Sequence, residues 1–187
     1  MKVNYCLSCG HSLEIRKIGG ESRRACPNCS YVFWGNYSIG VGALVMKDQK
    51  ILLIRRSQNP GKGKWTNPGG FIEQHESIEQ TVIREVYEET GIITRVKGIV
   101  ALRDLPSEVH NVYLVFSMNY IEGKPRADNV EVDSAGFYSR KEIETMNVAK
   151  LTKELINVAF DNPSYGLISN ANQIADYEIH RIQQIRS

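Results

Sequence analysis

The chain has 187 residues, of which 42% are hydrophobic and 24% charged, and its formal net charge at pH 7 is +2. This length suffices for one full-sized domain with a small appendage, and the composition is typical of a soluble globular protein. The small net charge argues against nucleic acid or a membrane surface as partner, and no apolar run approaches the roughly 20 residues that span a bilayer. The N-terminus also lacks the apolar core of a signal peptide. We therefore expect a cytoplasmic protein, in which cysteines are more often metal ligands than disulfides.

The pattern along the chain divides it into three regions. Residues 1–35 hold all four cysteines and little that could form a core, residues 36–146 alternate strand-like and helix-like segments, and residues 147–187 look mostly helical. The mixture of strands and helices in the middle region predicts a layered fold of the α/β or α+β class.

Two C-x-x-C pairs lie in the first region, with sixteen residues between them. Each pair can present two thiolates to one ion, and zinc prefers four such ligands in a tetrahedron, so the zinc would be structural rather than catalytic. Buried free thiols would not need this spacing, and a redox pair would need only one C-x-x-C. Zinc-binding modules bind nucleic acid in other proteins, so the pairs alone do not decide the function. The four cysteines are Cys6, Cys9, Cys26 and Cys29.

The middle region opens with two short apolar segments, residues 38–46 and 50–55, on either side of Lys47-Asp48-Gln49. Apolar runs that flank a polar turn predict a β-hairpin. Residues 57–64 are rich in Gly, Pro and Asn and predict a loop. Further strands are expected near residues 95–103, 110–120 and 134–138.

A helix is expected from about residue 78 to residue 90. Ser77 and Gln80 form the S-x-x-Q pattern of a capping box before it, and Gly91 suits a C-terminal cap. At about 100° per residue, its core face should carry Val82, Ile83 and Val86.

The other side of this helix gathers three carboxylates, those of Glu85, Glu88 and Glu89. Arg84 lies four residues before Glu88 and predicts an ion pair, while Glu85 and Glu89 are expected to stay free to bind a cation. A solvated, charged helix face is the plain alternative. However, clustered carboxylates repel one another, and a divalent cation such as magnesium relieves that repulsion.

The residues around the helix complete a longer pattern. Gly70 is followed after five residues by Glu76, and after seven more by Arg84-Glu85, an aliphatic residue, any residue, Glu88-Glu89, any residue, Gly91 and an aliphatic residue. This pattern resembles the Nudix box at every defining position, and the likeness to Nudix hydrolases extends over roughly residues 38–146. The cysteine pairs resemble the N-terminal zinc ribbon of NADH-pyrophosphatase-like and FAD/ADP-ribose-type members.

The resemblance implies an α/β class fold, with a Nudix α/β/α sandwich as its main domain. It implies a zinc ribbon at residues 1–35, a Nudix hydrolase domain at 36–146 and a helical C-terminal extension at 147–187. The implied activity is hydrolysis of a nucleoside diphosphate linked to another group. The implied cofactors are catalytic Mg²⁺ or Mn²⁺ and structural Zn²⁺.

The resemblance also assigns roles to the residues of the box. Glu85 and Glu89 would be the main magnesium ligands, and Glu88 an additional or water-mediated one. Glu76 and Arg84 would hold the helix and its acids in place. The implied ligands are therefore Glu85, Glu88, Glu89 and the carbonyl of Gly70.

The general base of many Nudix proteins lies on a loop outside the box. Residues 128–138 of this chain resemble that acidic loop, and Glu131 occupies its glutamate position. An ordinary solvated loop acid explains Glu131 equally well. Glu108 and Asp133 are the next candidates for the base.

The substrate expected first is ADP-ribose, followed by FAD and NADH. The ribbon resembles that of dinucleotide-cleaving members, the stretch after the box lacks the SQPWPFPxS signature of NADH pyrophosphatases, and Pro106 lies fifteen residues beyond Gly91 as in ADP-ribose hydrolases. Three arginines could contact phosphates, although surface arginines are commonly solvated: Arg55, Arg56 and Arg103. A non-catalytic nucleotide sensor or a nucleic-acid-binding regulator is the competing function, and the intact box glutamates favour the enzyme.

An apolar stripe marks the C-terminal segment, residues 170–185, in which alanines and isoleucines recur at helical spacing. We expect a helix there, packed on the main domain or on a second subunit. Because twofold homodimers are common among soluble proteins, a homodimer is the expected assembly.

Overall fold

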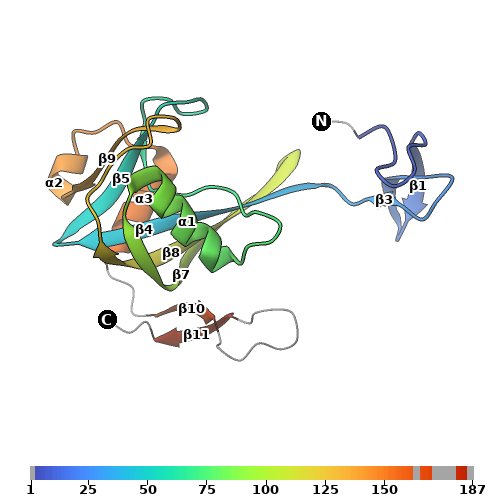
Figure 1. Cartoon of the computed structure of the whole chain (residues 1–187). Helices are drawn as coiled ribbons and strands as arrows, with labels where there is room; N and C mark the ends of the chain where they lie inside the picture. The colour runs from blue at the N-terminus through green and yellow to red at the C-terminus, as the bar shows by residue number, and fades with distance from the viewer. Residues whose placement is uncertain (1–2, 162–164, 170–179, 185–187) are drawn as a thin grey trace. The chain divides into compact units, whose positions relative to one another are not determined.

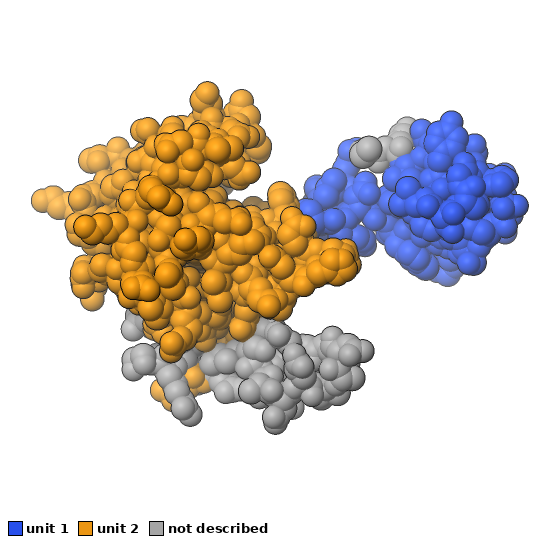
Figure 2. Space-filling view, in the orientation of Figure 1, with its two compact units in different colours: residues 1–38, 105–111 blue, residues 39–104, 112–187 orange. Residues whose placement is uncertain are grey.

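Residues 3–161, 165–169 and 180–184 are described by the computed structural model. They divide into two units, one of residues 1–38 and 105–111 and the other of residues 39–104 and 112–187 (Figure 2). None of the helices in the described part of the chain has the length and apolar composition of a membrane-spanning segment.

The first unit contains a small antiparallel sheet of β1 (Glu14–Ile18), β2 (Glu21–Ala25) and β3 (Val32–Phe33). Gly19 and Gly20 join β1 to β2 with φ values of 59° and 85°, the positive values that a two-residue hairpin turn requires. Its buried core consists of Leu13, Cys6 and Cys26. So small a core needs a further source of stability, and the expected metal would supply it.

The second unit is built on an eight-stranded sheet with the order β11-β10-β7-β8-β4-β5-β6, and β9 pairs with β5 (Figure 1). The predicted hairpin is confirmed, because β4 and β5 pair antiparallel around a turn in which Asp48 and Gln49 have φ values of 49° and 58°. The strands predicted near 95–103, 110–120 and 134–138 are β7, β8 and β9. The strands up to β9 are β4 (Asn36–Lys47), β5 (Lys50–Arg56), β6 (Trp65–Thr66), β7 (Ile93–Leu105), β8 (Val109–Glu122) and β9 (Val132–Tyr138).

Helices pack on both faces of this sheet. Val41 and Val45 of β4 join Val86 of α1 (Ile78–Thr90) in one core, whereas Leu44 joins Leu155 of α3 (Lys150–Phe160) in a second core. Since successive residues of a strand point to opposite faces, α1 and α3 cover opposite faces of the sheet. A short helix, α2 (Arg140–Ile143), lies between β9 and α3 in the sequence.

Helix α1 begins and ends where the sequence predicts. The Ser77 hydroxyl accepts from the Gln80 N–H, the Gln80 side chain accepts from the Ser77 N–H, and Gly91 caps the end with a φ of 69°. Val82 is fully buried as expected, but the expectation for Ile83 is wrong, because its side chain is 36% exposed. The buried side of α1 includes Glu89, which leaves Ile83 at its margin.

The C-terminal region is only partly helical. Helix α3 fulfils the expectation, but it is followed by β10 (Tyr165–Ser169) and β11 (His180–Gln184), which pair antiparallel. The helix predicted over residues 170–185 is therefore wrong for residues 180–184, and residues 170–179 and 185 lie outside the described part. Leu167 of β10 pairs with Ile99 of β7, so the edge of the large sheet provides a hydrogen-bonding partner that helical spacing cannot reveal. The homodimer rested on that helix and stays a prediction.

Candidate active site

The site begins with the backbone of Pro68, Gly69 and Gly70, which lies directly against β4. The Val41 N–H donates to the Gly70 carbonyl (2.8 Å), and the Ala43 N–H donates to the Pro68 carbonyl (2.9 Å). A Cβ on Gly69 would lie 2.1 Å from the Val41 carbonyl oxygen, and its φ of 150° also disfavours a side chain. Glycine is required here because only a bare backbone can approach the strand this closely.

Two glutamates of α1 meet this glycine backbone. A Cβ on Gly70 would lie 2.4 Å from the Cδ and Oε1 atoms of Glu85, and the Gly69 N–H donates to Oε2 of Glu89 (2.8 Å). Glu85 also accepts from Arg84 (2.9 Å), so both glutamates have partners within the protein, and the expectation that they bind a cation stays a prediction. These contacts hold both carboxylates against the backbone of Gly69 and Gly70.

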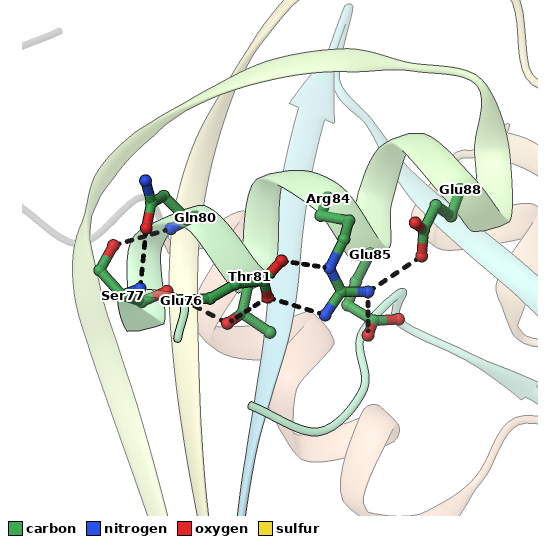
Figure 3. A network of polar contacts seen from close by, with 7 residues as sticks. All are labelled: Glu76, Ser77, Gln80, Thr81, Arg84, Glu85 and Glu88. Atoms are coloured by element: carbon green, nitrogen blue, oxygen red, sulfur yellow. Dashed lines mark hydrogen bonds and ion pairs between the residues drawn. The ribbon is translucent and has the colours of Figure 1, made fainter. Parts of the chain in front are cut away.

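Arg84 connects three glutamates in the network that Figure 3 shows. Its Nε and Nη2 atoms donate to the two carboxylate oxygens of Glu76 at 2.8 and 3.0 Å. Its Nη1 atom donates at 2.9 Å to both Glu85 and Glu88, so the predicted ion pair of Arg84 with Glu88 is confirmed. The Thr81 hydroxyl also donates to Glu76 (3.1 Å). Glu76 and Arg84 thus lie where they can hold the acids of the helix in place, as the resemblance implies.

Hydrogen bonding and burial shift the pKa values of these acids in opposite directions. The hydrogen bonds from Arg84 lower the pKa of Glu76, the glutamate that anchors the network. Burial raises the pKa of Glu85, and burial raises that of Glu89 to about 8, with the nearby charges of Glu85 and Glu131 adding to the effect. Ionising two neighbouring carboxylates with raised pKa values is unfavourable, and a cation bound between them would stabilise their charged forms.

These acids surround a pocket of about 610 Å³. Glu131 lies on its wall and is close enough to raise the pKa values of both Glu85 and Glu89. The Asp128 carboxylate shapes the Glu131 loop by accepting from the N–H groups of Val130 (2.9 Å) and Glu131 (3.1 Å). The described residues that line the pocket are Gly70, Phe71, Glu73, Arg84, Glu85, Glu88, Glu89, Asp128, Val130 and Glu131.

Several of these wall residues are absent from the sequence-based expectations. Asp128 had a signal, because an aspartate before a turn commonly accepts from the N–H groups that follow it. Phe71 and Val130, each 65% exposed, carry no such signal, since exposed apolar residues are ordinary until a pocket is seen beside them. Glu73 joins the wall through its place between Gly70 and Glu76.

The three arginines expected at phosphates are not among the described lining residues. Arg55 forms an ion pair with Asp133 at 2.6 Å, which occupies that candidate for the general base. Arg56 donates to the Pro60 carbonyl (2.8 Å), and the guanidinium of Arg103 lies over the Tyr113 ring. The last candidate base, Glu108, belongs to the other unit. Of the three candidate bases, Glu131 alone is among the described residues that line the pocket.

The four cysteines of the first unit form a second cluster. Cys9 Sγ lies 3.5 Å from Cys26 Sγ and 3.6 Å from Cys29 Sγ, all four sulfurs lie within 4.8 Å of one another, and no disulfide joins them. Four sulfurs about 2.3 Å from a tetrahedral zinc ion lie roughly 3.8 Å apart. The sulfur positions therefore fit a zinc ion.

The acidic pocket fits a harder cation. Its donors are carboxylate oxygens and a backbone carbonyl, which magnesium and manganese prefer over nitrogen or sulfur. Gly70 and Glu85 are in such close contact that any side chain at position 70 would displace the carboxylate. The pocket thus has the donor chemistry that the resemblance implies.

Comparison with known proteins agrees with this geometry. Residues 36–158 match the profile described as NUDIX domain. An ADP-ribose pyrophosphatase of Methanocaldococcus jannaschii is 35% identical over 128 residues, which cover 67% of this chain and 68% of that protein. An NAD-capped RNA hydrolase NudC of Actinobacillus succinogenes is 33% identical over 140 residues, covering 71% of this chain but 52% of that protein. This chain therefore spans about half the length of the second relative.

The fold has a close counterpart among solved structures. The crystal structure of a NUDIX hydrolase from Nitrosomonas europaea superposes with a TM-score of 0.77 at 25% sequence identity. The superposition covers 85% of this chain and 91% of that one, so the likeness extends well beyond the box and its helix.

Proposed function

The chain belongs to the Nudix hydrolase family, and we propose that it hydrolyses the diphosphate linkage of a nucleoside diphosphate derivative, with ADP-ribose as the first substrate to test. The observation that carries the proposal is the pocket in which Glu85, Glu89 and Glu131 gather around Gly70. The identity with an ADP-ribose pyrophosphatase supports this substrate ahead of FAD and NADH. The similarity to an NAD-capped RNA hydrolase makes NAD-capped RNA a second candidate, because NAD also contains a diphosphate linkage.

The catalytic cofactor we propose is Mg²⁺ or Mn²⁺, held by the carboxylates of Glu85, Glu88 and Glu89 and by the Gly70 carbonyl. When bound, it neutralises diphosphate oxygens and activates water for attack on phosphorus. The Gly70 carbonyl accepts from Val41 and keeps a second lone pair for a cation.

Three side chains would then have separate roles in the reaction, those of Glu131, Arg84 and Asp128. Glu131 takes a proton from water as the new O–P bond forms, and the bridging P–O bond breaks to release the second phosphate group. Arg84 keeps Glu85 and Glu88 from rotating away, and its own position is set by the two bonds to Glu76. The Asp128 carboxylate keeps Glu131 on the pocket wall by holding its backbone.

Zinc is the ion we propose for the cysteine cluster, with a structural role. The sulfur distances and the small core of the first unit both support it, because that core alone buries few apolar side chains. Four thiolates leave no position for water, so the ion would not take part in hydrolysis.

The domain division that we propose keeps a zinc ribbon at residues 1–35 and a Nudix domain from residue 36. The family match ends at residue 158 rather than 146, which supports counting α3 as part of the domain. The placement of α1 and α3 on opposite faces of the sheet supports an α/β/α sandwich.

A non-catalytic nucleotide sensor or nucleic-acid-binding regulator remains the alternative function. The three box acids on the pocket wall, Glu85, Glu88 and Glu89, favour the enzyme, since a binding module would not need so many carboxylates facing an anionic ligand. Binding of ADP-ribose with Mg²⁺ and no cleavage would favour the sensor.

The decisive experiment compares kcat/KM for ADP-ribose, FAD, NADH, NAD-capped RNA and 8-oxo-dGTP with Mg²⁺ and with Mn²⁺. The proposal expects AMP and ribose 5-phosphate from ADP-ribose, and the highest kcat/KM for that substrate. A strong preference for the triphosphate would overturn the dinucleotide assignment but not the hydrolase. A highest value for NAD-capped RNA would favour the second candidate.

A further inference from the structure

A buried polar network lies next to Gly69 and Gly70 in the sequence, on the face of the sheet that α3 covers. Asn67 is only 3% exposed, and its Nδ2 atom donates to the Tyr113 hydroxyl at 3.0 Å. The Thr152 hydroxyl of α3 donates to Oδ1 of Asn67 at 3.2 Å and can accept from the Thr66 hydroxyl at 3.0 Å. The Asn67 amide therefore has hydrogen-bonding partners on β8 and on α3. Without these partners, burial of the amide would destabilise the fold.

The network reaches the acidic pocket through the next residues of the chain. Asn67 also donates to the Pro68 carbonyl (3.3 Å), which accepts in addition from the Ala43 N–H (2.9 Å). One residue later, the Gly69 N–H donates to Glu89. Any shift of Asn67 would therefore move the donor that orients the most deeply buried acid of the pocket.

Strand β4 leaves space for this arrangement. A Cβ on Gly42 would lie 2.1 Å from the Tyr113 hydroxyl and 2.5 Å from Nδ2 of Asn67. The Tyr113 ring also lies 3.1 Å from where a Cβ on Gly40 would be. Two glycines on one strand thus accommodate one tyrosine, whose burial raises its pKa to about 12, so the phenol keeps its proton.

We propose that Asn67 is a positioning residue for the reaction, and that its hydrogen bonds to Tyr113 and Thr152 fix the backbone that orients Glu89. The inference rests on the proposed metal site at Glu85 and Glu89. An apolar side chain of similar size could fill the same space, but it would not hold the backbone of Pro68 and Gly69 in one position. The hydrogen bonds to α3 and β8 are directional, and they couple the packing of one face of the sheet to the carboxylates on the other.

The test is Asn67→Leu, with Mn²⁺ binding measured by isothermal titration calorimetry well below the melting temperature. Loss of a group that orients a ligand weakens metal affinity by about tenfold or more. We expect that loss for N67L, with kcat lowered and the KM for ADP-ribose within about twofold of wild type, because the substrate contacts remain.

A matched control separates positioning from simple loss of stability. Leu155→Ala opens the α3 core without touching Asn67, and it should lower the melting temperature while leaving Mn²⁺ affinity unchanged. Wild-type affinity in N67L, or an equal loss of affinity in L155A, would overturn the inference.

Two milder variants keep the test decisive if N67L does not fold. Thr152→Val and Tyr113→Phe each remove one hydrogen bond to Asn67 while nearly preserving shape, and each should weaken Mn²⁺ binding to an intermediate extent. Wild-type Mn²⁺ affinity in both would contradict the proposal.

Glu89→Gln distinguishes failure of the inference from failure of the proposed function. If Glu89→Gln binds Mn²⁺ as tightly as wild type, the metal site itself is wrong, and the inference falls with it. If E89Q loses binding but N67L does not, the metal site stands and the role of Asn67 is wrong.

Discussion

Gly70 and Glu85 are in such close contact that a Cβ on the glycine would lie 2.4 Å from the glutamate carboxyl. The contact joins the loop before the helix to the helix itself. It also gives a physical reason for the glycine of the pattern, which lies fifteen residues before Glu85.

Gly70→Ala should therefore displace the Glu85 carboxylate and slow turnover by about 100-fold, the scale expected when a reacting group is misplaced by about 1 Å. The φ of Gly70 does not itself demand glycine, so the fold should survive. Steady-state kinetics with ADP-ribose and Mg²⁺, together with circular dichroism, would measure both effects. Normal turnover in this variant would show that the contact has no catalytic consequence.

Glu85→Gln and Glu89→Gln should each reduce kcat by about 100-fold or more, because each removes a charge on which the proposed cation depends. Glu131→Gln should also slow the reaction, because it removes the carboxylate proposed as the general base. Glu154→Gln is the matched control, since Glu154 is an exposed glutamate on α3. Near-normal magnesium-dependent activity in E85Q or E89Q would show that the helix is structural only.

The stability of the protein should depend on pH through Glu76. Its pKa lies below the ordinary 4.5 because Arg84 donates two hydrogen bonds to the ionised form. A lowered pKa in the fold contributes stability that is present above about pH 4.5 and is lost as the pH falls through the folded value. Melting temperatures of wild type and Glu76→Gln should therefore differ most near pH 7 and converge below pH 4. A difference that stays constant over this range would exclude an ionised Glu76 as its source.

One zinc ion per chain should be present in protein purified without added metal, as elemental analysis would measure. Cys26→Ser should abolish zinc binding and expose residues 1–35 to limited proteolysis, because Cys26 is fully buried in the small core of the first unit. The second unit should keep its thermal transition, since its two cores contain none of the cysteines. A metal-free protein that resists proteolysis in this region would contradict the assignment.

The local elements followed from local signals. The box helix carries its own start and stop residues, Ser77 and Gly91, and both act in the structure as the patterns predict. The hairpin of β4 and β5 could likewise be predicted, because two apolar runs flank a short polar turn. Such features depend on contacts within a few residues, which spacing alone reveals.

The C-terminal segment shows where local signals fail. Its isoleucine spacing suits a helix, but residues 180–184 form a strand that pairs with β10. An isolated β-branched residue fits a helix or a strand. Residues 180–184 pair with β10, and β10 in turn pairs with β7 at the edge of the large sheet. The position of that edge depends on the whole sheet, which no window of the sequence contains.

The box pattern and the paired cysteines identify the family and the cysteine cluster without any structure. The fold set the surroundings of each acid: Glu89 is buried against Gly69, Glu85 is held by Arg84, and Glu131 comes from a distant loop to the same pocket. It also decided that Arg55 pairs with Asp133 rather than lining that pocket. The physical reason is that burial and charge pairing arise between residues far apart in the chain, whose distances are set only when the sheet and its two layers of helices have packed.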